Sequence, residues 1–254
     1  MLLAVDIGNT NIVMGVFQDR ELKHSWRVST RTEQTADEYA VLCRNLFDLN
    51  GVLTNSIQAV VLCSVVPPLN ECFSSLARQY FQAEPVFIEA EEQRLMPVLY
   101  NPPADVGADR IVNAIAAHRL HGGPAVIVDF GTATTFDTVS SVGEYLGGII
   151  APGIGVSAEA LFHQAAKLPR IEIREPDEAI GRSTVKSMQS GVFYGYVGLV
   201  EGILDRILGE LGPASVTATG GYAELIAEAF TGFDRIEPDL TMHGLRICYD
   251  DLSF

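Results

Sequence analysis

Two short stretches of the chain share one pattern of apolar and polar positions. Residues 2–15 read LLAVDIGNTNIVMG, an apolar run followed by an Asp, a Gly-Asn-Thr turn and a second apolar run. Residues 125–139 read AVIVDFGTATTFDTV and repeat that order around a Gly-Thr turn. Each pattern predicts a buried strand that turns tightly into a second strand, with polar groups at the hairpin tip. Asp6 and Asp129 lie 123 positions apart in a chain of 254 residues, which predicts a duplicated domain.

Strand and helix patterns alternate along the rest of the chain. In the first half they predict a helix over 36–49, a strand over 57–66 halted by Pro67 and Pro68, a helix from an Asn70 cap to Phe81, and a strand over 85–88. In the second half they predict helices over 157–167, 184–211 and 223–230 and a strand over 214–222. This alternation favours α/β architecture with a largely parallel sheet. Because no flexible linker separates the halves, we expect them to pack around a cleft.

Composition narrows the class of protein. The chain has 17 Lys and Arg against 32 Asp and Glu, a net charge of −15, and 48% of its residues are apolar. The apolar content excludes a disordered chain, and the acidity argues against non-specific nucleic-acid binding and against an anionic membrane surface. No stretch resembles a membrane-spanning helix, and the N-terminus lacks the basic region of a signal peptide. Four scattered cysteines favour reduced thiols in a cytosolic protein.

The first hairpin tip, DIGNTN, has the residue types of a phosphate site. Gly8 permits a tight turn, and the three polar residues after it supply donors, a nest of N–H groups that suits phosphate oxygens. Asp6 could hold Mg²⁺ or its water shell. An ordinary hairpin is the alternative, since Gly-Asn is a good turn pair. Repetition of the pattern as DFGTATT favours function, because two such tips facing one cleft could grip the phosphates of a nucleotide.

The segment 100–120, YNPPADVGADRIVNAIAAHRL, joins a rigid loop to a predicted helix. Asp109 and Arg110 open that helix, aimed out of the sheet. Asp109 could simply complement the helix dipole, an effect of about 0.3–1 kcal/mol. Arg110 gains nothing at the positive end of a helix unless it meets a carboxylate or phosphate, which a guanidinium binds in a bidentate way. An adjacent acid and base at this junction indicate a catalytic base beside an anion clamp.

For two further elements the sequence does not decide between a structural and a functional role. GGIIAPG at 147–153 offers close backbone approach but could equally be a packing turn. Thr184 lies in the first turn of a predicted helix, where Ser or Thr is commonly a cap.

Taken in order, DIGNTN, SVVP, NPPADVGADR, DFGTATT and GGIIAPG resemble the type III pantothenate kinases of the acetate and sugar kinase/Hsc70/actin superfamily. The resemblance runs from Asp6 to about Gly221, and NP…VGADR with DFGTATT is its most specific part. It implies an α/β fold of two similar actin-like, ribonuclease H-like domains, with mixed sheets flanked by helices and an interdomain cleft. The first domain, 1–120, would carry the ATP phosphate tip and catalytic loop. The second, 121–254, would carry the second tip, a monovalent cation site and a long dimer helix.

The family phosphorylates the primary hydroxyl of pantothenate with ATP to give 4'-phosphopantothenate, the first step of coenzyme A biosynthesis. The resemblance implies that Asp109 is the proton acceptor, that Asp129 binds K⁺ or NH₄⁺, and that Mg²⁺ accompanies ATP. It also implies a cytoplasmic homodimer in which Thr184 is contributed by the partner subunit. The remaining matches are ATP contacts at Asp6, Ile7, Gly8, Asn9, Thr10, Asn11, Ile12, Val13 and Thr132, and pantothenate contacts at Tyr100, Gly107, Ala108, Asp109, Arg110 and Thr184.

Two alternatives stay open at this point. One is a superfamily phosphatase, or a kinase for another small hydroxy acid, and the VGADR element argues against it. The other is a non-catalytic relative that acts as an accessory factor in gene regulation. Retention of Asp6, Asp109, Arg110 and Asp129 favours catalysis, because a protein that only binds has no need of the base.

Overall fold

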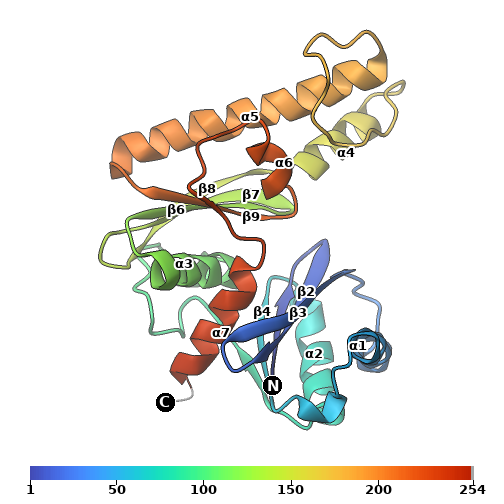
Figure 1. The fold of residues 1–254 in the computed structure, drawn as a ribbon, viewed down its shortest axis with the longest axis vertical. Helices are drawn as coiled ribbons and strands as arrows, with labels where there is room; N and C mark the ends of the chain where they lie inside the picture. The colour runs from blue at the N-terminus through green and yellow to red at the C-terminus, as the bar shows by residue number, and fades with distance from the viewer. Residues whose placement is uncertain (253–254) are drawn as a thin grey trace. The chain divides into compact units, whose positions relative to one another are not determined.

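The computed structural model describes residues 1–252, which form two compact units (Figure 1). Unit 1 comprises Met1–Arg119 with the segment from Asp239, and unit 2 comprises Leu120–Pro238. Within the described residues each unit contains one five-stranded sheet, ordered β3-β2-β1-β4-β5 in unit 1 and β8-β7-β6-β9-β10 in unit 2. The duplication predicted from the two hairpins is therefore confirmed, strand by strand.

Both sheets are mixed. In unit 1, β1 (Leu2–Ile7), β2 (Asn11–Gln18) and β3 (Glu21–Ser29) form an antiparallel meander, and β4 (Ala59–Ser64) and β5 (Pro85–Phe87) add in parallel beside β1. Unit 2 repeats this with β6 (Ala125–Phe130), β7 (Ala133–Val139), β8 (Tyr145–Pro152), β9 (Ser215–Gly220) and β10 (Arg235–Ile236). The mixed sheets that the family resemblance implies are confirmed. The largely parallel sheet expected from the alternation alone was wrong, because each hairpin forces its strands to run antiparallel.

Helices cover both faces of the unit 1 sheet. On one face, α1 (Ala36–Leu49) and α2 (Pro67–Tyr80) enclose the core around Leu3, Val5 and Ile7. Because side chains alternate along a strand, Ala4 and Asp6 belong to the opposite face. That face meets α7 (Leu240–Leu252), whose Met242 lies over Gly15 and whose His243 ring packs edge-on against Phe17. The sheet therefore holds Asp6 on the side that faces α7.

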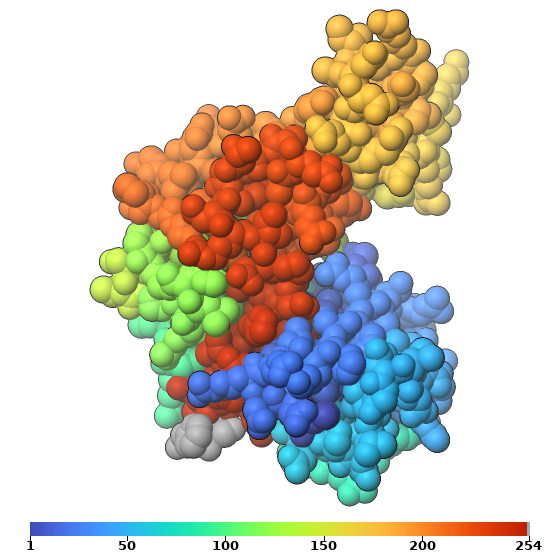
Figure 2. Space-filling view, in the orientation of Figure 1, coloured from blue at the N-terminus to red at the C-terminus, as the bar shows by residue number. Residues whose placement is uncertain are grey.

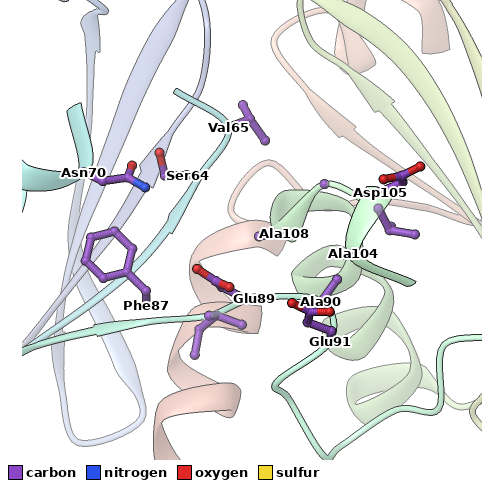
Figure 3. A pocket seen from close by; sticks show the side chains of 13 residues that line it. Ser64, Val65, Asn70, Phe87, Glu89, Ala90, Glu91, Ala104, Asp105 and Ala108 are labelled. Carbon is purple, nitrogen blue, oxygen red and sulfur yellow. The ribbon is translucent and has the colours of Figure 1, made fainter. Parts of the chain in front are cut away.

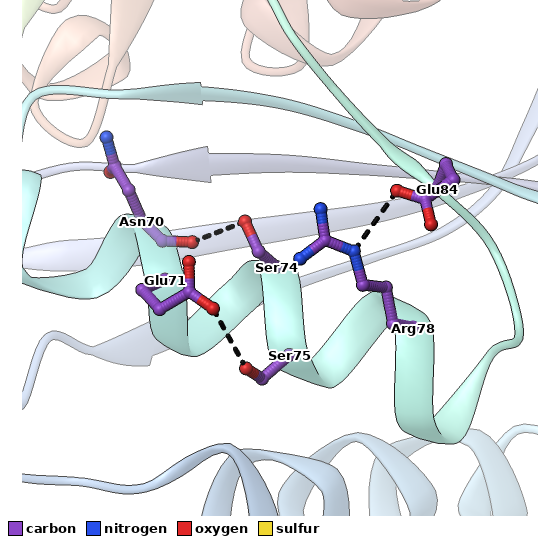
Figure 4. A network of polar contacts seen from close by, with 6 residues as sticks. All are labelled: Asn70, Glu71, Ser74, Ser75, Arg78 and Glu84. Atoms are coloured by element: carbon purple, nitrogen blue, oxygen red, sulfur yellow. Dashed lines mark hydrogen bonds and ion pairs between the residues drawn. The ribbon is translucent and has the colours of Figure 1, made fainter.

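The start of α2 differs from the prediction. The helix begins at Pro67 rather than after an Asn70 cap, and Asn70 lies inside its first turn. Proline is well placed at a first helical position, since no intrahelical partner exists there for an N–H group. The carbonyl of Asn70 accepts a hydrogen bond from the Ser74 hydroxyl at 2.8 Å (Figure 4). Further along the same surface, Arg78 pairs with Glu84 at 3.1 Å.

The C-terminal segment belongs with unit 1, although the domain 121–254 was expected to include it. Helix α7 packs on β1, β2 and β4. It also crosses α3 (Ala108–His121) so closely that a Cβ on Gly244 would lie 2.3 Å from the carbonyl oxygen of Val112. Only hydrogen fits at that position, which explains a glycine in the middle of a helix.

In unit 2 the helices are α4 (Ile154–Gln164), α5 (Thr184–Leu211) and the short α6 (Ala223–Ala227). The predicted bounds of α5 agree with the structure, α4 begins before the predicted Ser157, and α6 is shorter than predicted. Phe193, Val200 and Leu204 of α5 pack with Val126 and Val128 of β6 in the core. In the space-filling view, α4 and the segment that follows it project from the rest of the unit (Figure 2). No helix among residues 1–252 has the length and apolar character needed to cross a membrane.

Replacing Gly244 with Ala tests the crossing of α7 and α3. The added methyl would overlap the Val112 carbonyl, and overpacking of this kind costs about 1–3 kcal/mol. We expect a lower free energy of unfolding in urea. Gly155→Ala is the matched control, since its Cβ would meet only Tyr222 at 3.4 Å, and it should be neutral or slightly stabilising. Equal stability of the two variants would contradict the close crossing.

Candidate functional site

The β1–β2 hairpin of unit 1 ends in a tight polar tip. The Gly8 N–H donates to the Asn11 carbonyl at 3.1 Å, and Asn9 and Thr10 are exposed at the turn. Ile7 and Ile12 are fully buried in the core, so only their main chain is available to a ligand. Val13 is partly buried in β2, paired with Asp6.

Asp6 lies at the end of β1 beside a buried thiol. Asp6 pairs with Cys63 of β4 in the parallel register, and the Cys63 Sγ donates a hydrogen bond to the Asp6 Oδ1 at 3.3 Å. Burial raises the pKa of the Cys63 thiol well above its usual range, and the negative charges of Asp6 and Asp109 raise it further. The thiol therefore stays protonated, and both carboxylates lie within electrostatic range of it. Sequence analysis missed Cys63, which precedes the SVVP element directly.

Asp109 occupies the first turn of α3 with its carboxylate folded back on the chain. Its Oδ1 accepts the Arg110 N–H at 2.8 Å, and a Cβ on Gly107 would lie 2.5 Å from that oxygen. Burial raises the pKa of Asp109, while the Arg110 N–H and the Arg110 charge oppose that shift. A carboxylate with a raised pKa is the stronger proton acceptor near neutral pH. Gly107 is therefore required for the shape of the site, which explains the glycine of VGADR.

Arg110 is buried, which the sequence did not indicate. It is 7% exposed and counts among the buried residues of α3. Its charge acts on Asp109 inside unit 1. A buried guanidinium requires hydrogen-bond acceptors or an anion beside it. The position of Arg110 therefore still suits the binding of an anion, inside unit 1 rather than at its surface.

A cavity of about 230 Å³ opens next to this segment, at the carboxyl ends of β4 and β5 (Figure 3). Ligands of α/β sheets bind outside the carboxyl ends of parallel strands. Within the described residues, the Oδ1 of Asn70 is buried in the wall without a hydrogen bond. Tyr100 is 37% exposed and lies outside the lining. The wall is formed by Ser64, Val65, Asn70, Phe87, Ile88, Glu89, Ala90, Glu91, Ala104, Asp105, Val106, Gly107 and Ala108.

In unit 2, Asp129 lies at the end of β6 in a space kept open by glycine. A Cβ on Gly220 would lie 2.5 Å from the Asp129 Oδ1, and Gly220 has φ +90, which favours glycine. Gly131 also borders that oxygen, at 3.8 Å from a hypothetical Cβ. The TGGY element, weak as a sequence signal, thus makes room around the Asp129 carboxylate.

The tip after β6 is closed by the GGIIAPG element. The Gly153 N–H donates to the Thr132 carbonyl at 3.1 Å, and a Cβ on Gly153 would lie 2.3 Å from the same oxygen. Close backbone approach is therefore the role of Gly153. Thr132 is exposed at the tip. Thr184 is exposed at the start of α5, but the helix cap is Ser183, whose side chain accepts from the Lys186 N–H.

The raised pKa of Asp109 predicts a pH-dependent stability. The folded state holds the Asp109 proton more tightly than the unfolded chain does. The stabilising contribution of this group is therefore complete below the unfolded pKa and is lost as pH rises through the folded pKa. Asparagine does not titrate, so the melting temperature of Asp109→Asn relative to the wild type should rise as the pH goes from about 4, near the ordinary pKa of an Asp, to about 8.

Asp105→Asn serves as the control, since Asp105 is exposed in the loop before α3. It should leave the melting temperature within about a degree of the wild type at both pH values, as surface changes usually do. A melting-temperature difference for Asp109→Asn that does not change with pH would contradict the buried-carboxyl assignment.

Four similarities place the chain among known proteins. A family model described as type III pantothenate kinase matches residues 2–206. A type III pantothenate kinase of Myxococcus xanthus (strain DK1622) is 52% identical over 250 residues, with 98% of each chain covered. Among solved structures, a Campylobacter jejuni protein assigned to the Baf family of transcriptional activators has a TM-score of 0.63 at 22% identity, covering 99% of this chain and 98% of that one. An inorganic polyphosphate/ATP-glucomannokinase from Arthrobacter has a TM-score of 0.53 at 13% identity, covering 100% and 99%. These two solved structures share the fold of this chain.

Proposed function

The chain belongs to the type III pantothenate kinases, and on that premise we propose that it transfers the γ-phosphoryl group of ATP to the primary hydroxyl of pantothenate. The product is 4'-phosphopantothenate, the first intermediate of coenzyme A synthesis. The observation that supports catalysis most directly is the Asp109 carboxylate, whose pKa burial raises, in electrostatic range of the same thiol as Asp6. A gene-regulatory role is not favoured, because the relative at 52% identity is named as a kinase and the Baf family protein shares only the fold.

In the proposed reaction Asp109 accepts the proton of the pantothenate hydroxyl as the hydroxyl oxygen bonds to the γ-phosphorus. The bond between that phosphorus and the bridging oxygen breaks, and ADP leaves with the electron pair. Phosphoryl transfer demands positioning and charge stabilisation more than covalent work by the protein. The Gly107 turn and the Arg110 N–H hold the Asp109 carboxylate in one orientation, so the base is pre-positioned.

We assign nucleotide binding to the tip residues Asp6 to Val13 and to Thr132. The tight Gly8 turn and the exposed Asn9 and Thr10 supply donors suited to phosphate oxygens. The Asp6 carboxylate fits a hydrated Mg²⁺, since hard cations take oxygen ligands and often keep their waters. Mg²⁺ bound with ATP would neutralise developing charge on the phosphates. Cys63 donates to Asp6 and thereby limits the rotation of its carboxylate.

We assign a monovalent cation, K⁺ or NH₄⁺, to Asp129. The fit rests on an oxygen donor in a space that a side chain at Gly220 would fill. Such a cation would add positive charge to a strongly acidic protein that binds anionic ligands. The role of Asp129 is to hold it through the carboxylate.

For pantothenate we assign residues Gly107 to Arg110 together with the adjoining cavity of about 230 Å³. Ser64 and the amide of Asn70 offer hydrogen bonds inside it, and the buried Asn70 Oδ1 has an unused acceptor. Arg110 is the cationic residue of this segment, and a guanidinium suits a carboxylate. Tyr100 would approach from the exposed loop before the cavity wall.

We infer a homodimer built on α5. Gly191, Gly195, Gly198, Gly202 and Gly209 recur at helical spacing on one face of this 28-residue helix. Glycine in a helix interior costs about 1 kcal/mol relative to alanine, so such a row favours close approach of another backbone. A Cβ would meet nothing within 4 Å at Gly191, Gly195, Gly198 or Gly209. Exposed apolar side chains of unit 2 add area, namely Ile149, Ile150, Val156, Leu161, Val185 and Tyr194. Thr184 at the start of α5 would then reach the partner's site.

The four cysteines among the described residues are free thiols. Free thiols persist in reducing compartments, and ATP and pantothenate are cytoplasmic metabolites in this pathway, so we propose a cytoplasmic location.

Replacing Asp109 with Asn tests the catalytic assignment. General-base catalysis contributes roughly 10²–10⁴ in rate, so we expect ADP release with pantothenate to fall at least about a hundredfold in a folded variant. A coupled ADP-release assay measures it. Turnover by the wild type should require pantothenate and should rise when K⁺ replaces a large organic cation. A folded Asp109→Asn variant that keeps a near-wild-type rate would contradict the assignment of Asp109 as the catalytic base.

Replacing Gly195 with Leu tests the dimer. The side chain would separate two close helices, so sedimentation equilibrium should show a monomer, and the KM for pantothenate should rise as Thr184 is withdrawn. Glu210→Ala, on the same helix but outside the glycine row, should remain dimeric. A monomeric wild type, or a Gly195→Leu variant as dimeric as the control, would be incompatible with this interface.

A further inference from the structure

Thr30, directly after β3, holds the main chain of the first tip through two hydrogen bonds. The Thr30 hydroxyl donates to the Gly8 carbonyl at 2.6 Å, and the Thr30 N–H donates to the Thr10 carbonyl at 3.0 Å. Both carbonyls belong to the turn that follows Asp6. Thr30 is absent from every motif that the sequence singles out, because the contact spans 22 positions.

The two bonds decide which dipoles the tip offers to a ligand. A carbonyl oxygen that accepts a hydrogen bond from Thr30 is turned toward Thr30, and its negative end is therefore turned away from an anion bound at the turn. The Gly8 N–H is already used inside the turn by the Asn11 carbonyl. In a chain of net charge −15, a free carbonyl oxygen at a phosphate site would add to the repulsion of the anion.

Thr30 is itself fixed by the core. The Tyr39 hydroxyl of α1 accepts the N–H of Arg31 at 3.2 Å and donates to the Arg31 carbonyl at 3.0 Å. Tyr39 is fully buried, and its ring packs against Phe73 of α2 at 4.9 Å between centroids. The main chain next to Thr30 is therefore held by the packing of α1 and α2. Through Thr30 the same packing restrains the hairpin tip.

We propose that Thr30 is a positioning residue for the nucleotide phosphates, acting by locking the Gly8 and Thr10 carbonyls so that the tip presents N–H groups. The inference rests on the proposed function, in that it concerns the ATP-binding tip. It assigns Thr30 no contact with the reacting atoms.

The test compares Thr30→Val with Thr30→Ser. Valine has the shape of threonine but no hydroxyl, whereas serine keeps the donor. Loss of a hydrogen bond of ordinary strength corresponds to about a tenfold change in an equilibrium constant. We expect Thr30→Val to raise the KM for ATP and the Kd for ADP, the latter measured by calorimetry, by about tenfold. The KM for pantothenate should stay within about twofold, which is less than the loss of one hydrogen bond would cause. Thr30→Ser should restore both the KM for ATP and the Kd for ADP.

Thr138→Val is the matched control. Its hydroxyl also bonds to a glycine carbonyl, that of Gly147 at 2.8 Å, but at the far end of β7 from the tip of unit 2. It should lower stability to a similar extent and leave both KM values unchanged. If Thr30→Val does not fold, Tyr39→Phe can be used instead, since it removes the hydrogen bonds between the Tyr39 hydroxyl and the main chain of Arg31. It should raise the KM for ATP about threefold, less than Thr30→Val, because it acts on the tip only through Thr30.

The outcomes separate this inference from the proposed function. A wild type without ATP-dependent phosphorylation of pantothenate would remove the proposed function, while the ADP measurement would still test Thr30. An active wild type whose folded Thr30→Val variant binds ADP normally, or loses affinity for both substrates equally, would overturn the positioning role. A selective loss of nucleotide affinity that serine rescues would support it.

Discussion

The register in which β1 pairs with its neighbours is the constraint from which the candidate site of unit 1 follows. β1 is the central strand, antiparallel to β2 and parallel to β4, so its end brings the hairpin tip and the end of β4 to the same edge of the sheet. That register sets Asp6 opposite Cys63. A slip of one residue would send Asp6 into the core around Val5 and expose an apolar side chain in its place. The apolar run of β1 therefore fixes the position of its one carboxylate.

Strand register also fixes a carboxylate in unit 2, although the residues around that carboxylate are different. β6 is again central, and Asp129 stands at its end opposite Thr135 and Thr219. In unit 1 the neighbour of the carboxylate is a thiol donor, whereas in unit 2 the carboxylate lies close to the backbone at Gly220. The two carboxylates therefore have different surroundings, which agrees with the different ions proposed for the two halves.

Local sequence predicted the elements and the duplication well, because hydrophobic periodicity and turn residues are local signals. The first turn of α3, with Asp109 in it, could be placed from VGADR alone. Three features could not. The contact of Cys63 with Asp6 spans 57 positions, and that of Thr30 with Gly8 spans 22, so both depend on strand register. The burial of Arg110 depends on packing around α3, and the place of α7 in unit 1 depends on a fit at Gly244 that no local pattern encodes.

Three glycines of the sequence motifs stand where the structure leaves no room for a side chain. Gly107, Gly153 and Gly220 each stand where a Cβ would lie within 2.5 Å of an oxygen, that of Asp109, Thr132 or Asp129 respectively. Each leaves a carboxylate or a carbonyl room to approach the chain. The chemistry of the site is thus carried by acidic side chains whose surroundings are built from backbone.

Local dipoles and bound cations, rather than a basic surface, are proposed to hold the anionic ligands of this acidic chain. The most direct test is the dependence of kcat/KM for ATP on ionic strength, at fixed Mg²⁺ and K⁺, from about 50 to about 300 mM tetramethylammonium chloride. With a net charge of −15, long-range repulsion is screened by salt, so kcat/KM should stay level or rise. A fall of about tenfold or more, the behaviour of a site that relies on a basic surface, would contradict the account.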